Sequence, residues 1–362
     1  MKYHMIVATF VFLLMAGQAL PQPPGPAVPR PPGPALFQAL GPPWAAEVSV
    51  PSSRRIQFTS AINGEPYTLF IHVPLTPPPP DGYPVIYVLD GDFLFGMASD
   101  ISLTIGDPKL TPVVVAIGHG LLENMDVAAR YSPRKPGDTS PVGLADIGIA
   151  LNKLRFHDFT LPVAPNHRAP DWTGLTPDDV GGVDDFLKVI ETEIKPKVAA
   201  AIPVNKADQA IFGHSIGGLA VLRALFTEPT AFRTFIASSP SIWWDADAIL
   251  KGEQKFADAV EGGRANPRVL ITVGAEEPDS PNPPQSFIAT LPPDKAAALN
   301  AYVKMAGQWS GMVSGARDLA ARLGKIHGGA GYKVRFVAFE GENHASVQPA
   351  ALSRAMHFAF DQ

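Results

Sequence analysis

The sequence contains no cysteine, which excludes disulfide bonds, thiol catalysis and cysteine-ligated metal sites. It also lacks the His-Glu-x-x-His spacing of zinc peptidases, and no run is rich in lysine and arginine. The net charge is −5, so neither the composition nor the charge pattern favours a nucleic-acid partner.

The apolar run nearest the N-terminus is too short to span a bilayer comfortably, because Met5–Ala16 has only 12 residues. Lys2 precedes this run, and the small residues of Ala-Gly-Gln-Ala at 16–19 allow cleavage after Ala19. We expect a signal peptide over 1–19, a periplasmic or secreted protein, and no stable membrane anchor after cleavage. The alternative is an uncleaved helix that lies in the membrane interface.

Proline is abundant, with 39 residues in the chain, and Pro-Pro-Gly-Pro occurs twice between residues 21 and 43. Such a segment cannot build a core of its own, so we expect an extended tether over 20–53. The whole chain is 46% hydrophobic and 17% charged, which suits one large globular domain. We place that domain at 54–362.

The apolar pattern of this domain predicts an α/β fold. Residues 85–89 and 113–117 are continuous apolar runs, which are typical of strands buried on both faces of a parallel sheet. Two β-rich runs flank Asn63-Gly64 and predict an antiparallel hairpin. Further strands are expected to end at 212 and to cover 234–237, 269–273 and 334–339, with helices over 183–200 and 313–324 and from 349 onward. Strands that alternate with helices give a mainly parallel sheet of about eight strands flanked by helices.

Residues 119–181 interrupt this alternation. They are rich in proline, glycine and charge, and they separate a strand from the next helix. Long insertions of this kind commonly form lids or substrate walls, so we expect a lid-like insert there.

The sequence Gly213–Gly218, Gly-His-Ser-Ile-Gly-Gly, follows a short apolar run and opens an apolar helical stretch. The pattern Gly-x-Ser-x-Gly in a strand–turn–helix setting places a serine in a strained turn with its hydroxyl exposed above the sheet. Ser215 is therefore the candidate nucleophile. The alternative is a glycine turn whose serine only caps the helix.

In a sheet of this kind the partners of the serine follow it in the order acid, then histidine. Among the nine histidines, only His344 lies in a loop just after the last strand. It is the expected general base for Ser215 and then the general acid for the leaving alcohol. The alternative is a surface histidine in a polar loop.

The acid is less sharply defined, because the loop after the 269–273 strand carries Glu276, Glu277 and Asp279. A buried carboxylate is wanted there to accept the imidazole N–H and stabilise the imidazolium. We prefer Glu277, with Glu276 second. If all three are solvated, the serine and the histidine would work as a pair.

Two backbone N–H groups are expected to bind a developing oxyanion. One is that of Ile216, directly after the serine. The other is that of Asp92, because Gly91 allows a sharp turn after the strand that ends at Leu89.

These residues together resemble the putative-esterase family of α/β-hydrolases, which includes esterase D, feruloyl esterases, mycolyltransferases and enterochelin-type siderophore esterases. The matching segments are Leu-Asp-Gly at 89–91, Gly-Gly-Val-Asp-Asp-Phe-Leu at 181–187, Phe-Gly-His-Ser-Ile-Gly-Gly-Leu at 212–219, Ser-Pro-Ser-Ile-Trp-Trp-Asp at 239–245 and Gly-Glu-Asn-His-Ala-Ser-Val at 341–347. The resemblance covers about residues 54–360 and implies an α/β-hydrolase fold.

The resemblance also implies Ser215 as nucleophile, His344 as base, and Ile216 and Asp92 as oxyanion donors. Two features depart from the family pattern. The insert around 119–153 is longer than expected, and the acid loop reads Gly-Ala-Glu-Glu where the family commonly has Gly-Glu-x-Glu. The second departure favours Glu277.

The leading hypothesis is an exported serine esterase that works through an acyl-enzyme and needs no cofactor. Its sharpest substrate is a siderophore trilactone, and this choice rests on the resemblance. Ferric catecholates are anionic, so we expect cationic and aromatic side chains in the pocket. The candidates are Arg130 or Arg155 and Trp243 or Trp244; the alternatives are salt-bridged arginines and tryptophans packed in the core.

Three other functions stay open. The same fold could transfer the acyl group to an alcohol other than water, or it could act on general or feruloyl-type esters. A binding protein with a degraded site is a different class, and the complete Gly-x-Ser-x-Gly motif argues against it.

Overall fold

The computed structural model describes residues 50–121, 125–131, 143–163, 175–277 and 311–361, with isolated positions at 279, 289, 293 and 296–297. The signal peptide predicted at 1–19 lies outside these residues. So does the tether predicted at 20–53, apart from residues 50–53. Parts of the insert expected near 119–181 also lie outside the described residues.

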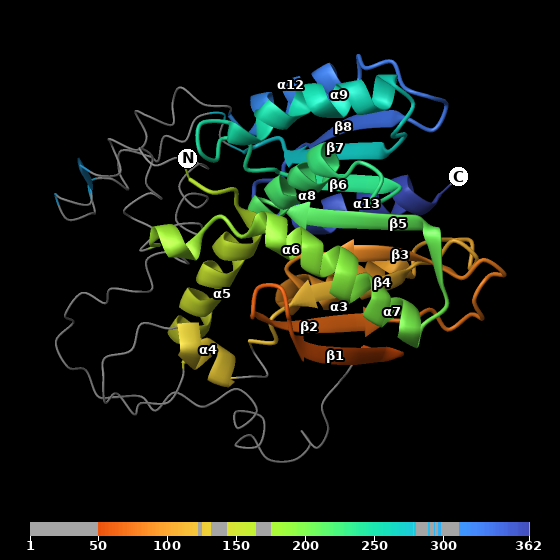
Figure 1. Ribbon diagram of the computed structural model, residues 1–362, viewed down its shortest axis with the longest axis horizontal. Helices are drawn as coiled ribbons and strands as arrows, with labels where there is room; N and C mark the ends of the chain where they lie inside the picture. Colours follow the sequence, from red (N-terminus) through yellow and green to blue (C-terminus); the bar gives the residue numbers. More distant parts are fainter. Residues whose placement is uncertain are drawn as a thin grey trace.

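An eight-stranded sheet forms the centre of the molecule, as Figure 1 shows. The strands are β1 (Ser53–Thr59), β2 (Pro66–His72), β3 (Tyr83–Val88), β4 (Val113–Gly118), β5 (Val204–His214), β6 (Thr234–Ser238), β7 (Arg268–Gly274) and β8 (Lys333–Phe339). Their order across the sheet is β1-β2-β4-β3-β5-β6-β7-β8. The pairs β1–β2 and β2–β4 are antiparallel and the other pairs are parallel. The predicted α/β-hydrolase fold, with a mainly parallel sheet, is confirmed.

How apolar each strand is depends on its position in the sheet. All six residues of β3 and of β4 are buried, because helices cover both faces of the sheet at its centre. The hairpin expected around Asn63-Gly64 joins β1 and β2, with Thr59 opposite Pro66. Gly64 adopts a φ of 74°, which glycine tolerates without strain.

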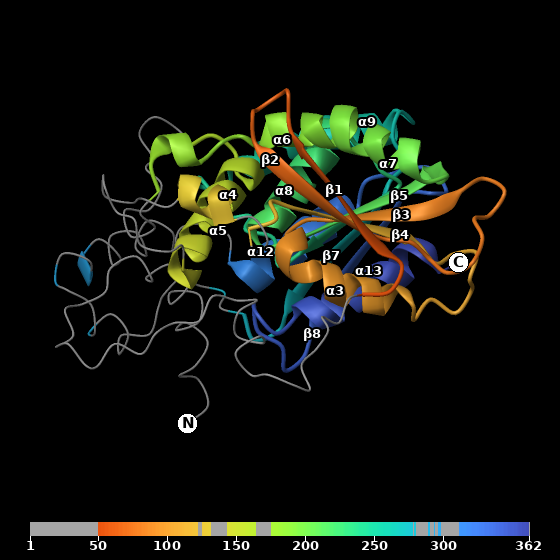
Figure 2. The ribbon, with the colours of Figure 1, turned by 90° about the horizontal axis from the view of Figure 1, so that it is seen from below.

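The helices lie in two layers, one on each face of the sheet (Figures 1 and 2). The layer that includes the helix after β3 consists of α3 (Gly91–Ser102) and α13 (Gln348–Phe360). The other layer consists of α6 (Val183–Val189), α7 (Lys195–Ala201), α8 (Ile216–Thr227), α9 (Glu253–Glu261) and α12 (Met312–Leu323). None of the helices in the described part of the chain is both long enough and apolar enough to cross a bilayer.

The helix expected over 183–200 contains a widened turn. A π-helical turn, η3 (Ile190–Ile194), joins α6 to α7. Pro196 stands near the start of α7. Proline has no N–H to donate to the preceding turn, and its ring clashes with the carbonyl four residues earlier. The widened turn relieves that clash, which the apolar periodicity alone does not predict.

Most of the described part of the 119–181 insert is helical. It contains α4 (Met125–Tyr131) and α5 (Leu144–Phe159), which pack on each other through a small apolar cluster. Near its end α5 also packs on the main core through Phe156 and Phe159. The insert is therefore anchored to the domain, and its role as a lid stays a prediction.

Packing of α8 against the sheet provides a test of the fold. Leu222 is fully buried in the main core, so Leu222→Ala should lower the free energy of unfolding by about 2–5 kcal/mol. Leu103, which follows α3 and is 59% exposed, is the control. Leu103→Ala should change the free energy of unfolding by less than about 0.5 kcal/mol. Urea unfolding followed by circular dichroism measures both. Equal losses in the two variants would contradict this placement of α8.

Candidate active site

The turn between β5 and α8 holds Ser215 in an unusual backbone conformation, with φ 62° and ψ −122°. The strand and the helix approach so closely there that a Cβ on Gly213 would lie 2.2 Å from the carbonyl oxygen of Gly217. A Cβ on Gly218 would lie 2.9 Å from the carbonyl oxygen of Ser238. Both positions therefore require glycine. The motif forms the strained strand–turn–helix arrangement that brings a serine hydroxyl to the end of a strand.

A chain of hydrogen bonds joins Ser215, His344 and Glu277. The Nε2 atom of His344 is 3.0 Å from Ser215 Oγ, and its Nδ1 atom is 2.7 Å from Glu277 Oε2. The side chain of Glu277 is completely buried, whereas that of His344 is 15% exposed. The three residues come from the ends of β5, β7 and β8, which parallel pairing brings to one edge of the sheet.

Glu277 is held by donors that the sequence analysis did not identify. Its Oε1 atom accepts hydrogen bonds from Ser239 Oγ at 2.5 Å and from the backbone N–H of Gly274 at 2.7 Å. Ser239 follows β6, the neighbour of β7, and has a φ of 43°. Two signals marked it in the sequence: it lies two residues after the strand expected over 234–237, and it is the first residue of the family-like segment 239–245. With His344, these donors give the buried carboxylate three partners.

The other two carboxylates of this loop lie elsewhere. Glu276 is exposed. The Oδ1 atom of Asp279 accepts hydrogen bonds from the backbone N–H groups of Val313 and Ser314, in the first turn of α12. Asp279 therefore caps a helix, which an acidic side chain also stabilises through the helix dipole. Of the three candidates, the structure brings only Glu277 to the imidazole.

His214, the residue before the serine, packs against His344. The two ring centroids are 4.6 Å apart, and His214 Nδ1 lies 3.2 Å from Ser238 Oγ. Burial, together with the nearby charges of His344 and Arg155, holds the pKa of His214 well below its usual range. His214 is therefore a neutral ring that supports the other imidazole. In the sequence, His214 stood out only as part of the serine motif.

The expected oxyanion donors lie in the first turns of two helices that start from neighbouring strands. Ile216 is the first residue of α8 and Asp92 is the second residue of α3. N–H groups in the first turn of a helix have no partner within that helix, and they lie at the positive end of its dipole. The carboxylate of Asp92 is also engaged, because it accepts hydrogen bonds from the N–H groups of His119 at 2.7 Å and Leu121 at 3.0 Å. Those bonds fasten the start of α3 to the segment that follows β4.

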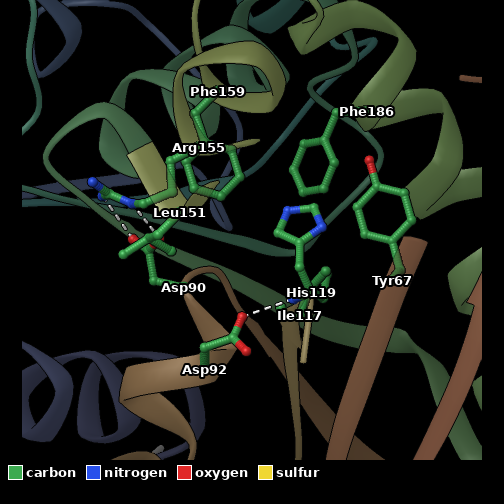
Figure 3. Close-up of a pocket in the computed structure, with 10 residues that line it drawn as sticks. Tyr67, Asp90, Asp92, Ile117, His119, Leu151, Arg155, Phe159 and Phe186 are labelled. Atoms are coloured by element: carbon green, nitrogen blue, oxygen red, sulfur yellow. Dashed lines mark hydrogen bonds and ion pairs between the residues drawn. The ribbon is translucent and has the colours of Figure 1, made fainter. Parts of the chain in front are cut away.

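The two arginine candidates have different surroundings. Arg130 is exposed at the end of α4 and lies over the ring of Tyr131. Arg155, on α5, forms a two-bond ion pair with Asp90, which directly precedes α3. Figure 3 shows this pair beside Asp92. Arg155 is thus already matched with a carboxylate of this chain.

The tryptophan candidates lie at the core. Trp244 is only 2% exposed, its Nε1 atom donates to the carbonyl oxygen of Leu161 at 3.1 Å, and its ring packs on Phe156. It is a core residue, as the packing alternative expected, and the choice of Trp244 as a substrate contact is wrong. Trp243 is half-buried and also packs against the main core.

A small hollow opens beside Asp92 and Arg155, with a volume of about 10 Å³, close to what one water molecule needs. Tyr67 and His119 form part of its wall (Figure 3). Behind them the fully buried carboxylate of Asp158 accepts a hydrogen bond from the Tyr67 hydroxyl at 2.8 Å. Burial raises the pKa of Tyr67 well above its usual value. No signal in the sequence pointed to this network.

Comparison with known proteins connects this geometry to a family. The family model described as putative esterase matches residues 164–314. The chain is 31% identical to the ferri-bacillibactin esterase BesA of Bacillus subtilis, over 86% of this chain and 90% of that protein. It is 29% identical to a siderophore triacetylfusarinine C esterase of Aspergillus fumigatus, over 87% of this chain and 95% of that protein.

The fold shows the same relationship. The crystal structure of the BES protein from Bacillus cereus superposes with a TM-score of 0.63 at 26% sequence identity. The match covers 88% of this chain and 99% of that one. The sequence match to BesA spans nearly the whole of both proteins, and the solved structure has the same architecture. The chain therefore belongs to the putative-esterase family and is an esterase.

Proposed function

We propose that this protein is an exported serine hydrolase that cleaves the ester bonds of a siderophore through an acyl-enzyme on Ser215. The hydrogen-bonded series from Ser215 Oγ through His344 to Glu277 carries the proposal. One end is the hydroxyl of Ser215, on a strained turn and only 4% exposed, and the other end is a completely buried carboxylate. This is the arrangement that activates a serine for attack on a carbonyl carbon.

The partners of the imidazole assign its protons. Glu277 Oε2 only accepts, so the Nδ1 atom of His344 carries the ring hydrogen. The Nε2 atom is then the acceptor for the hydroxyl proton of Ser215. As Oγ attacks the ester carbonyl, Nε2 takes that proton and Glu277 stabilises the resulting imidazolium. The N–H groups of Ile216 and Asp92 bind the oxyanion.

The remaining steps repeat the same transfers. His344 gives its proton to the leaving alkoxide, which departs as the alcohol and leaves the acyl group on Ser215. Water then attacks the acyl carbon while Nε2 accepts one of its protons. The bond between the acyl carbon and Ser215 Oγ breaks as Nε2 returns that proton to Oγ, and the acid is released. An alcohol in place of that water would give transfer instead of hydrolysis.

The siderophore substrate rests on the relatives. One is named for ferri-bacillibactin and the other for triacetylfusarinine C. Both names specify esterases, so a small-molecule siderophore ester is the class of substrate that we assign. Export rests on the apolar run and the small residues near the start of the chain, which predict a periplasmic or secreted enzyme.

A panel of esters tests the substrate and the nucleophile together. Wild type and Ser215→Ala would be incubated with short-chain esters, feruloyl esters, and free and iron-loaded siderophore trilactones, and the products read by mass spectrometry. We expect wild type to release linear oligomers of the siderophore monomer. Ser215→Ala should lose at least about 10³-fold in rate, because it has no hydroxyl to form the acyl-enzyme.

Competing alcohols in the same panel separate transfer from hydrolysis, because transfer products would be esters of the added alcohol. Turnover of simple esters without trilactone cleavage would leave a general esterase. Wild type that turned over no ester, and that did not react with a fluorophosphonate, would favour a binding protein and would overturn the proposal.

The adjacent glutamates provide a matched test of the acid. Glu277→Gln should lower kcat by about 10²- to 10⁴-fold, because an amide cannot stabilise the imidazolium and can favour the wrong tautomer. Glu276→Gln removes the same charge at the neighbouring position, where the side chain is exposed. Its kcat should stay within about twofold of the wild-type value. Steady-state kinetics on a chromogenic short-chain ester measures both. Similar kcat values for the two variants would mean that the serine and histidine act without the acid.

A further inference from the structure

The ion pair of Arg155 and Asp90 stands at the start of α3. Arg155 Nε donates to Asp90 Oδ1 at 2.5 Å, and Nη2 donates to Oδ2 at 2.9 Å. Their side chains are only 19% and 10% exposed, so water screens them weakly. Asp90 also has a φ of 60°, a left-handed conformation that is uncommon for a residue other than glycine. Strain of this kind persists only where surrounding contacts hold it.

The carboxylate of Asp90 lies near the two residues that are expected to supply the oxyanion donors. In the chain it is two residues before Asp92, one of the two expected donors. In space, the position that a Cβ on Gly217 would occupy is 3.5 Å from Asp90 Oδ2, and Gly217 follows Ile216, the other donor. A fixed negative charge therefore stands beside the place where the reaction creates another one.

The energy of two such charges is large enough to affect the rate. Like charges repel more strongly the closer they lie and the less water screens them, so an uncompensated carboxylate near the oxyanion would raise the barrier to its formation. A cation at a fixed position is needed to compensate the negative charge of Asp90. Arg155 supplies it with a planar two-bond geometry that holds the charge in place.

We propose that Arg155 keeps the oxyanion hole effective by cancelling the charge of Asp90, an inference that rests on the proposed function. Arg155 acts through Asp90 and touches neither the substrate nor the reacting atoms, so it is a positioning residue. Its guanidinium also ties α5 of the insert to the start of α3. The insert thus contributes the positive charge of Arg155, on α5, to the site.

The test uses an uncharged substrate, p-nitrophenyl acetate, so that contacts with an anionic siderophore play no part. Arg155→Gln leaves Asp90 unmatched, and kcat should fall about 10- to 100-fold while KM changes by less than about threefold. Arg155→Lys keeps a charge and should lose less. The double variant Asp90→Asn with Arg155→Gln replaces the charged pair with a neutral one, and it should recover most of the lost kcat.

A second readout measures the oxyanion directly. Phenylboronic acid is neutral, but its boron accepts the lone pair of Ser215 Oγ while the hydroxyl proton passes to His344, giving a tetrahedral boronate anion. Its inhibition constant should rise about 10- to 100-fold in Arg155→Gln and fall back in the double variant. Rates are expressed per active site titrated with a fluorophosphonate, and thermal unfolding is recorded for each variant, so a loss of folded protein is not counted as a loss of kcat.

Arg223→Gln is the matched control. Arg223, in the second half of α8, forms the same two-bond pair with Asp184, at 2.7 and 2.9 Å, and its loss should leave kcat within about twofold. An unchanged kcat in Arg155→Gln, or a double variant no faster than that single variant, would overturn the inference. So would an effect confined to KM for an anionic siderophore, which would make Arg155 a substrate contact. Wild type that is inactive on every ester would instead mean that the proposed function has failed.

Discussion

The close approach of β5 to α8 determines where the other parts of the site must lie. Only glycine allows the two backbones to come this close, because a Cβ on Gly213 would lie 2.2 Å from the carbonyl oxygen of Gly217. The approach forces Ser215 to a positive φ, which costs of the order of 1–3 kcal/mol. Fully buried neighbours on both elements, including Phe212 and Leu219, offset that cost by packing. Because the serine is then held at the end of β5, its partners must come from the ends of strands farther along the same edge.

The order of the strands explains why both expected oxyanion donors meet at this point. β3 and β5 are neighbours in the sheet, yet α3 leaves β3 toward one face and α8 leaves β5 toward the other. A crevice at the carboxyl ends of the strands forms wherever neighbouring strands send their helices to opposite faces. The N-termini of α3 and α8 both lie at this point of the sheet. Their dipoles and unpaired N–H groups favour negative charge there before any side chain contributes.

Much of this arrangement could be predicted from the sequence, because it depends on patterns that are local. Strands buried on both faces leave continuous apolar runs, and the order serine, acid, histidine selects His344 from nine candidates. The choice between Glu276 and Glu277 was harder, since it depends on a one-residue difference within a turn. The contacts of Ser239 and Arg155 could not be predicted, because they join segments 38 and 65 residues apart through the docking of whole elements. The sequence carries no local signal for such pairs.

In the proposed mechanism the site stabilises a transient negative charge, although Glu277, Asp92 and Asp90 belong to the same strand ends. Glu277 has three hydrogen-bond partners, which are a hydroxyl, a backbone N–H and the imidazole. Asp92 receives two backbone N–H groups from the segment after β4, and Asp90 receives a guanidinium from the insert. A carboxylate that accepts several hydrogen bonds or pairs with a cation exerts a weaker field on its surroundings than an isolated one. Each of the three charges thus has its own donors, and in the proposed mechanism the N–H groups of Ile216 and Asp92 bind the oxygen of the substrate.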